Sequence, residues 1–205
     1  MRILIAIPTY DGKMEPETVK SLWSLDKCGN DVDLHVQYGY GVDMARNRIA
    51  DRALDGRYDW LLTVDADMVL PKDALRNLLE HETDICMGYY RNRWASEDSP
   101  KTCAIPFGED WTKRCELKTF RNALANGTHT MRVRGGGMGC CLIKPSVFGR
   151  IPFPWFEWHD WERHSKSLGE DVDFFIKAER AGIPIYVDTR VACGHKFRRV
   201  ISAEE

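Results

Sequence analysis

Two carboxylates one residue apart, Asp65 and Asp67, follow a continuous apolar run from Trp60 to Val64. Such a run is typical of a fully buried strand, so both carboxylates are expected at its C-terminal end, where open α/β sheets bind ligands. Two negative charges this close repel each other and lose hydration when packed inside, so they need a cation. Paired oxygen ligands suit Mg²⁺ or Mn²⁺, which substrate phosphates often complete. The alternative is that one of them caps the helix that follows Pro71.

The elements that position these carboxylates form three predicted strand–helix units. Strands are predicted at 3–7, 33–38 and 60–64, and helices at 15–27, 43–54 and 72–81. The apolar positions of the first helix are Val19, Leu22, Trp23 and Leu25. On the second we expect the inward residues to be Met44, Ile49, Ala50 and Ala53, and the largely outward ones to be Arg46, Arg48, Asp51 and Arg52. Alternating units predict a mostly parallel sheet with helices on both faces, so three strand ends share one crevice.

The second half of the chain is less regular. We expect strands at 84–89, 140–143 and 183–187, a short helix at 145–148, a helix from 169 to 182, and only short strands and loops over 103–130. Glycines at 135–137 indicate backbone held close to a ligand or to a neighbouring segment. The aromatic loop 151–161, which prolines interrupt, either lines a site or plugs one end of the core.

Composition limits the class of protein. At 205 residues the chain is expected to form a single domain, and its net charge of −2 gives no global attraction to nucleic acid or acidic membranes. Seven cysteines without a C-x-x-C pair predict reduced, buried thiols and a cytosol-like compartment. No apolar stretch suits a signal peptide or a membrane span, so we expect a soluble cytoplasmic protein, in the host cytoplasm if it is viral or from a phage.

An ordered set of motifs resembles a glycosyltransferase of the GT-A fold, and more narrowly the family 2 transferases. The set comprises the Pro8-Thr9-Tyr10 strand end, the Arg46-Asn47 helix, Asp65-Ala66-Asp67, the glycine-rich strand, the Gly169-Glu170-Asp171 helix start and Gly194-His195. A lone D-x-D motif is a weak signal, but the order of the whole set is more specific. The resemblance covers nearly the whole chain, least at 103–130. It implies one GT-A (Rossmann-like) domain over 1–205, in which 1–90 bind a nucleotide sugar and 91–205 bind an acceptor.

The resemblance also implies roles for individual residues. Donor-binding residues would be Pro8, Thr9, Tyr10, Asp11, Arg46, Asn47, Asp65 and Ala66. The metal ligands, for Mn²⁺ or Mg²⁺, would be Asp65, Asp67 and His195. Asp171 would be the catalytic base of an inverting enzyme, with Glu170 beside it on the acceptor side. The acceptor-binding residues would be Trp155, Trp158, Gly136 and Gly137.

Elementary chemistry is consistent with these roles. Breaking the bond between a sugar and a diphosphate develops negative charge, which a bound cation stabilises. The attacking hydroxyl loses a proton that a carboxylate can accept, and the helix dipole is expected to keep Asp171 ionised. Simpler alternatives stay open: Glu170 and Asp171 as helix-capping residues only, His195 in a solvated basic tail, and Arg46 and Asn47 on the surface.

The sequence therefore predicts a metal-dependent glycosyltransferase that moves a sugar from a UDP- or GDP-type donor to a hydroxyl acceptor. A saccharide, a lipid-linked acceptor or a modified base in DNA are all open, with basic clusters at 91–93 and 196–199 as the DNA surface in the last case. A nucleotidyltransferase is the main rival, but the loop at 8–12 is not a glycine-rich basic phosphate loop. A non-catalytic module that binds sugar nucleotides or carbohydrates is the other alternative.

Overall fold

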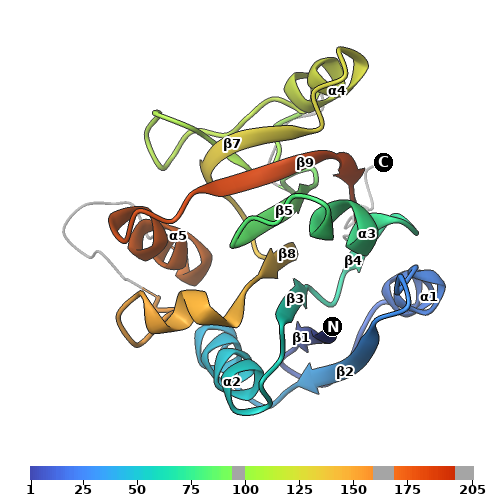
Figure 1. Ribbon diagram of the computed structural model, residues 1–205, viewed down its shortest axis with the longest axis vertical. Coiled ribbons are helices and arrows are strands. Elements are labelled where there is room, and N and C mark those ends of the chain that lie inside the picture. The colour runs from blue at the N-terminus through green and yellow to red at the C-terminus, as the bar shows by residue number, and fades with distance from the viewer. Residues whose placement is uncertain (94–99, 159–168, 197–205) are drawn as a thin grey trace, which may run out of the picture.

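The computed structural model describes residues 1–93, 100–158 and 169–196 (Figure 1). The strands are β1 (Arg2–Pro8), β2 (Asp31–Gln37), β3 (Trp60–Val64), β4 (Met68–Val69), β5 (Ile85–Tyr89), β6 (Ile105–Pro106), β7 (Thr130–Gly135), β8 (Cys140–Ile143), β9 (Ile185–Ala192) and β10 (Gly194–His195). The helices are α1 (Pro16–Ser24), α2 (Val42–Asp55), α3 (Ala74–Leu79), α4 (Leu117–Ala125), α5 (Glu170–Arg180) and a 3₁₀ helix, η1 (Pro145–Gly149).

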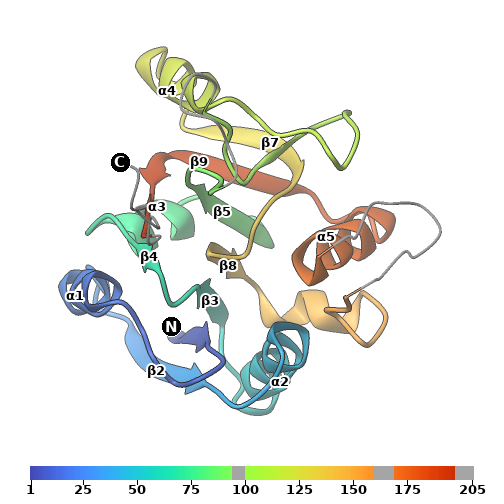
Figure 2. The ribbon, with the colours of Figure 1, turned by 180° about the vertical axis from the view of Figure 1, so that it is seen from behind.

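Eight strands form the central sheet, in the order β2-β1-β3-β8-β5-β9-β7-β6. β1 pairs in parallel with β2 and β3, and β5 with β9, whereas β7 and β8 run antiparallel to their neighbours. Six of the eight strands therefore point the same way. Helices α2 and α5 lie on one side of the sheet and α1 and α3 on the other (Figures 1 and 2). This arrangement confirms the predicted α/β class with a mostly parallel sheet and helices on both faces.

Strand β3 carries the two carboxylates to the C-terminal edge of the sheet. All five of its residues are buried between β1 and β8, which explains why its sequence is a continuous apolar run. After Asp65 the chain turns into β4, which pairs with β10 so that His195 lies opposite Met68. A basic tail was predicted from residue 194 onward, but 194–195 form a strand beside the carboxylates.

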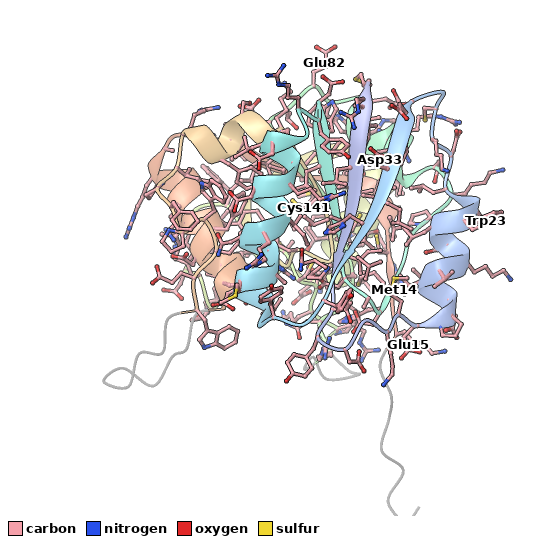
Figure 3. The ribbon with its side chains drawn as sticks, turned by 90° about the horizontal axis from the view of Figure 1, so that it is seen from below. Met14, Glu15, Trp23, Asp33, Glu82 and Cys141 are labelled. Carbon is pink, nitrogen blue, oxygen red and sulfur yellow. The ribbon has the colours of Figure 1, made fainter. Side chains whose placement is uncertain are left out.

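Of the four residues predicted for the apolar face of the first helix, Leu22 and Leu25 are buried, whereas Val19 and Trp23 are exposed. In α1 the buried residues are Thr18, Ser21 and Leu22, while Trp23 is 89 % exposed and points away from the molecule (Figure 3). A polar contact explains this orientation of the helix, because Thr18 Oγ1 donates to the carbonyl of Ala66 at 3.0 Å. Val19 is likewise exposed.

In α2 the inward and outward positions predicted for Met44 and Arg46 are reversed. Met44 is half exposed, whereas Arg46 is only 4 % exposed. The buried stripe of this helix consists of Ala45, Arg46, Ile49, Ala50 and Ala53. Ile49, Ala50 and Ala53 were predicted to face inward, and Arg46 continues their helical spacing; only its charge argued against burial.

The remaining differences concern the second half of the chain. Helix α4 lies within 103–130, where only strands and loops were expected. All seven cysteines are free and six of them are buried, as predicted. None of the helices in the described ranges has the length and apolar character needed to cross a bilayer.

Candidate active site

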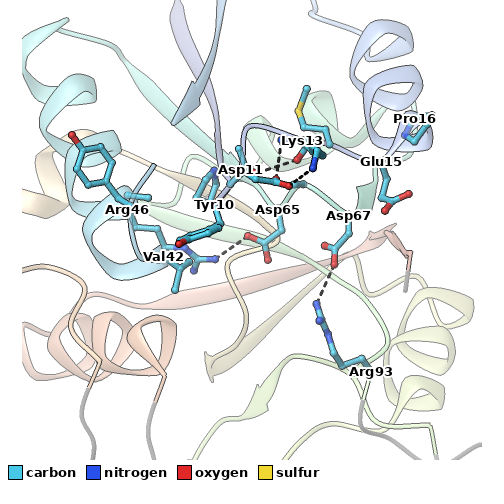
Figure 4. A pocket seen from close by; sticks show the side chains of 16 residues that line it. Tyr10, Asp11, Lys13, Glu15, Pro16, Val42, Arg46, Asp65, Asp67 and Arg93 are labelled. Carbon is cyan, nitrogen blue, oxygen red and sulfur yellow. Dashed lines mark hydrogen bonds and ion pairs between the residues drawn. The ribbon is translucent and has the colours of Figure 1, made fainter. Parts of the chain in front are cut away.

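A cavity of about 800 Å³ opens at the C-terminal ends of β1 and β3 (Figure 4). Seven of the eight predicted donor-binding residues line it: Pro8, Thr9, Tyr10, Asp11, Arg46, Asp65 and Ala66. Lys13, Tyr40, Asp67 and Arg93 also line it, none of which was predicted as a donor-binding residue. Its volume lies in the range of small-molecule and cofactor sites.

A buried arginine joins the cavity to helix α5. Arg46 donates from Nη2 to Asp65 Oδ1 at 2.8 Å, and its Nη1 lies 3.2 Å from Glu170 Oε1. Burial raises the pKa of Glu170, although Arg46 opposes that shift. A guanidinium can hold two carboxylates at once because its donors form a rigid planar fork. Arg46 therefore fixes the carboxylate of Asp65 at the cavity wall.

Asp171 occupies the first turn of α5, where its Oδ1 accepts the backbone N–H of Val172 at 2.7 Å. Burial raises the pKa of Asp171, and the opposing charge of Arg46 does not cancel this effect. The helix dipole was expected to favour the anion of Asp171, whereas burial shifts its pKa in the opposite direction. A carboxylate with a raised pKa is closer to the value that suits a general base near neutral pH.

Asp67, His195 and Arg93 form a compact polar group at the mouth of the cavity. His195 Nε2 lies 3.4 Å from Asp67 Oδ2, and Arg93 Nη2 donates to Asp67 Oδ2 at 3.0 Å and to His195 Nε2 at 3.2 Å (Figure 4 shows the Arg93–Asp67 bond). His195 Nδ1 donates to the carbonyl of Arg91 at 3.0 Å. Burial lowers the pKa of His195, but Asp67 and the Arg91 carbonyl outweigh it and raise the pKa overall.

This group provides a partial fit to a divalent cation. With Nδ1–H committed to a carbonyl, the neutral imidazole turns its unprotonated nitrogen, Nε2, towards Asp67, which is the usual arrangement of a histidine metal ligand. Asp65, by contrast, is bound to Arg46, and the described part of the chain contains no cluster of three or more His, Cys, Asp or Glu side chains at metal-binding geometry. The protein thus presents two donors, and phosphate oxygens and water would complete the coordination.

A second, smaller cavity of about 210 Å³ adjoins the first. The two cavities share Asp65 and Arg93, and the smaller one is also lined by Tyr90, Asn92, Cys103, Arg114, Gly136, Gly137, Asp171 and His195. The predicted base, the predicted metal histidine and two of the predicted acceptor residues therefore meet in one place. Tyr90, Asn92, Cys103 and Arg114 were not identified as site residues from sequence, because they come from segments without a recognisable motif.

The glycines at 136 and 137 pack closely against neighbouring side chains. A Cβ on Gly137 would lie 2.1 Å from the hydroxyl of Tyr90, and one on Gly136 would lie 2.5 Å from Met87 Cε. Of the two explanations considered from sequence, a neighbouring segment accounts for both glycines. Their backbone also forms part of the wall of the smaller cavity.

Gly137→Ala is expected to destabilise the protein by about 1–3 kcal/mol, because the new methyl group would displace the buried Tyr90 ring. Gly149→Ala is the matched control, since no atom lies within 4 Å of a Cβ added there. The free energy of unfolding from urea denaturation would measure both. Equal stability of the two variants would show that Tyr90 moves aside without cost.

The aromatic loop divides into a buried and an exposed part. Trp155 is buried, and its Nε1 donates to the carbonyl of Phe148 at 2.8 Å. Phe156 stacks on Phe174 with ring centroids 4.8 Å apart. Trp158 is 53 % exposed. The buried Trp155 therefore fits the alternative in which the loop plugs the core, whereas Trp158 is accessible to solvent. Residues 159–161 lie outside the described residues.

Asn47, the eighth predicted donor-binding residue, is not among the residues that line the large cavity. Its Oδ1 accepts the backbone N–H groups of Trp155 at 2.9 Å and Phe156 at 3.2 Å, and its Nδ2 donates to the carbonyl of Phe156 at 2.7 Å. The side chain thus anchors the aromatic loop to α2. Consecutive helix positions point about 100° apart, so Arg46 and Asn47 face different neighbours.

Of the predicted basic clusters, Arg93 is paired with Asp67 and Lys196 with Glu17. Residues 197–199 lie outside the described ranges.

The mixed central sheet, the helices on both faces and the cavity at the strand ends define a GT-A domain. Three solved structures share this fold. The protein A197 from STIV has 21 % identity and a TM-score of 0.65, and the match covers 97 % of this chain and 87 % of that one. GalNAc-T7 with UDP, GalNAc and Mn²⁺ has 15 % identity and a TM-score of 0.65 over 96 % of this chain and 44 % of that one.

TarS residues 1–349 from S. aureus, in complex with UDP-GlcNAc, has 15 % identity and a TM-score of 0.57, and the match covers 98 % of this chain. This chain spans 60 % of that TarS chain and less than half of the GalNAc-T7 chain. No family model and no curated protein sequence matches the chain. At these identities the likeness shows the fold.

Proposed function

We propose that the protein is a metal-dependent glycosyltransferase that moves a sugar from a nucleoside diphosphate sugar, of UDP or GDP type, to a hydroxyl acceptor. The observation that carries the proposal is the junction of the two cavities at Asp65, with a carboxylate of raised pKa, Asp171, lining the smaller one. Two neighbours in fold were crystallised with ligands of this class, UDP-GlcNAc in TarS and UDP, GalNAc and Mn²⁺ in GalNAc-T7.

The two cavities would bind the two substrates separately. The larger is lined by residues between 8 and 67 together with Arg93, so the nucleotide sugar would bind mainly to the 1–90 half. The smaller is lined mainly by residues between 90 and 195 and would receive the acceptor. The sugar would then lie at the junction, over Asp65. In this arrangement the acceptor hydroxyl and the diphosphate approach the sugar from different cavities, which suits a direct displacement with inversion.

A residue of the chain is then available for each step of the sugar transfer. The acceptor oxygen forms a bond to the anomeric carbon, its proton passes to the carboxylate of Asp171, and the bond from the sugar to the diphosphate breaks. Glu170 holds Arg46, and Arg46 holds Asp65 against the sugar. Asp67 and His195 would hold Mn²⁺ or Mg²⁺, with phosphate oxygens and water completing the coordination, while Asp65 stays bound to Arg46. The ion supplies positive charge against the leaving diphosphate.

A thermal-shift panel tests the proposal. The protein is mixed with UDP, GDP, their sugars and the corresponding monophosphates, each with and without Mn²⁺. A ligand that binds the native state stabilises it by about 2.7 kcal/mol at a concentration of 100 Kd. We expect one diphosphate series to raise the Tm, and to require metal for its full effect. Indifference to every nucleotide would contradict the proposal.

Arg93→Ala is expected to raise the affinity for Mn²⁺ in the absence of nucleotide by about two- to fivefold, the effect of removing a competing ion pair of about 0.5–1 kcal/mol. The reason is that Arg93 contacts both Asp67 and His195, the two side chains that face a common point. Calorimetric titration with Mn²⁺ measures the change. Lys13→Ala is the control, because Lys13 lines the same cavity but pairs with Asp11. Equal Mn²⁺ affinity in both variants would show that Arg93 does not compete with the ion.

A further inference from the structure

The smaller cavity contains a cation that forms no ion pair with a carboxylate of the described residues. Among the described residues Arg46 pairs with Asp65 and Glu170, and Arg93 with Asp67, whereas Arg114 forms no ion pair. Its hydrogen bonds to described residues use Nη1 alone, which donates to the carbonyls of Trp111 and Lys113, both at 2.8 Å. With respect to the described residues, Nε and Nη2 therefore retain their donor capacity, and the Arg114 side chain lines the cavity.

Arg114 is held in place by its surroundings. Trp111, whose carbonyl it binds, stacks beneath the guanidinium of Arg134, which lies 4.3 Å from the ring centroid. Arg134 is fixed in turn by Glu179 on α5, through contacts of 2.9, 3.0 and 3.2 Å. This chain of contacts ties the loop that carries Arg114 to the helix that carries Asp171. The two side chains therefore line the cavity in a fixed relation to each other.

Part of the wall of this cavity is formed by backbone. Gly136 and Gly137 line it, and a Cβ would lie 2.1 Å from the Tyr90 hydroxyl at Gly137 and 2.5 Å from Met87 Cε at Gly136. A ligand in a space of about 210 Å³ would therefore contact Arg114 and Asp171 together. An oriented guanidinium with free donors binds phosphate or carboxylate through two parallel hydrogen bonds.

Resting on the proposed function, we propose that the acceptor carries an anionic group, a phosphate or a carboxylate, which Arg114 binds while a hydroxyl of the same molecule faces Asp171. Arg114 would thus be the specificity-determining residue of the acceptor site. A neutral saccharide would leave the donors of Arg114 to water and gain nothing from its charge. The alternative is that Arg114 serves only to favour the anion of Asp171, whose pKa it lowers.

The binding of small anions to the protein with nucleotide already bound tests whether Arg114 holds an anionic group of the acceptor. UDP or GDP with Mg²⁺, whichever the panel identifies, first fills the larger cavity, and inorganic phosphate or acetate is then titrated by calorimetry. We expect one of the two anions to bind, and which one binds distinguishes a phosphate from a carboxylate acceptor. Arg114→Gln should weaken that binding by at least about tenfold, as for a lost charge-assisted hydrogen bond. Arg114→Lys, which keeps the charge but loses the fork, should fall between the two.

Lys113→Gln is the matched control, because Lys113 is the adjacent cation and is exposed. Neither anion binding to the wild-type complex, or equal binding by wild type and Arg114→Gln, would overturn the assignment. A role for Arg114 in ionising Asp171 alone predicts unchanged anion binding and a shifted pH profile. Failure of every nucleotide to bind would instead contradict the proposed transferase, so the two failures are distinguishable.

Discussion

Asp171→Asn is expected to lower kcat by about 10²–10⁴-fold and to leave the affinity for the donor unchanged. The amide keeps the size of the side chain but cannot accept the proton of the attacking hydroxyl. Asp171 lines the smaller cavity and takes no part in the larger one, so the nucleotide should bind as before. Steady-state transfer rates and calorimetric titration with the nucleoside diphosphate measure the two quantities separately.

The pH dependence provides an independent check on Asp171. Burial raises its pKa above 3.8, so the wild-type rate should fall as the pH falls through that raised value. The effect of pH on stability has the opposite sign to its effect on rate. Because the pKa of Asp171 is raised in the folded protein, the protonated carboxyl is favoured there. The stabilising contribution of Asp171 is therefore present below pH 3.8 and is lost as the pH rises through the folded pKa. The permanently neutral Asp171→Asn variant should therefore have a Tm at neutral pH at least equal to that of the wild type.

Asp51→Asn is the control for this experiment, since it makes the same chemical change at an exposed position of α2. It should retain wild-type activity. Full activity in Asp171→Asn would remove this residue as the base and leave it a helix-capping role. Loss of activity together with loss of donor binding would point to a collapsed site rather than to a missing base.

Arg46→Met is expected to destabilise the protein by about 3–5 kcal/mol, because it leaves two carboxylates without their cation. For a chain of this length the loss corresponds to a fall in Tm of about 6–20 °C. Arg46 is 4 % exposed and is the shared partner of Asp65 and Glu170, which lie on different elements. Methionine fills a similar volume, so the measured loss reports the charge rather than a cavity.

Arg48→Met is the matched control two positions further along the same helix. Arg48 is exposed and stacks on Tyr40, so its loss should change stability by no more than about 0.5 kcal/mol. The double variant Arg46→Met with Glu170→Gln should recover part of the loss, because one of the two orphaned charges is removed. A Tm of Arg46→Met equal to that of Arg48→Met would show that the buried ion pairs are not formed in solution.

Hydrophobic patterning predicted the elements that carry the site. The buried strand at 60–64, the helix that Glu170 and Asp171 open, and the parallel arrangement all follow from local periodicity and from the alternation of strands and helices. Patterning did not predict the antiparallel strand β8 between β3 and β5. Strand order depends on long-range pairing that leaves little trace in the apolar run itself.

The amino-acid sequence by itself determined which residues stand at the ends of the elements, because strand ends, caps and breakers are local features. It therefore placed Asp65 and Asp67 at the end of a strand and Asp171 at the start of a helix, whereas His195, predicted in a basic tail, lies in β10. Only the tertiary structure decided their partners, because an ion pair joins positions that are far apart in the chain. Burial of Arg46 between residues 65 and 170 and the placement of Arg93 between residues 67 and 195 are of this kind. From sequence, a charged side chain is predicted to lie on the surface, because the opposite charges that allow it to be buried are known only from the tertiary structure.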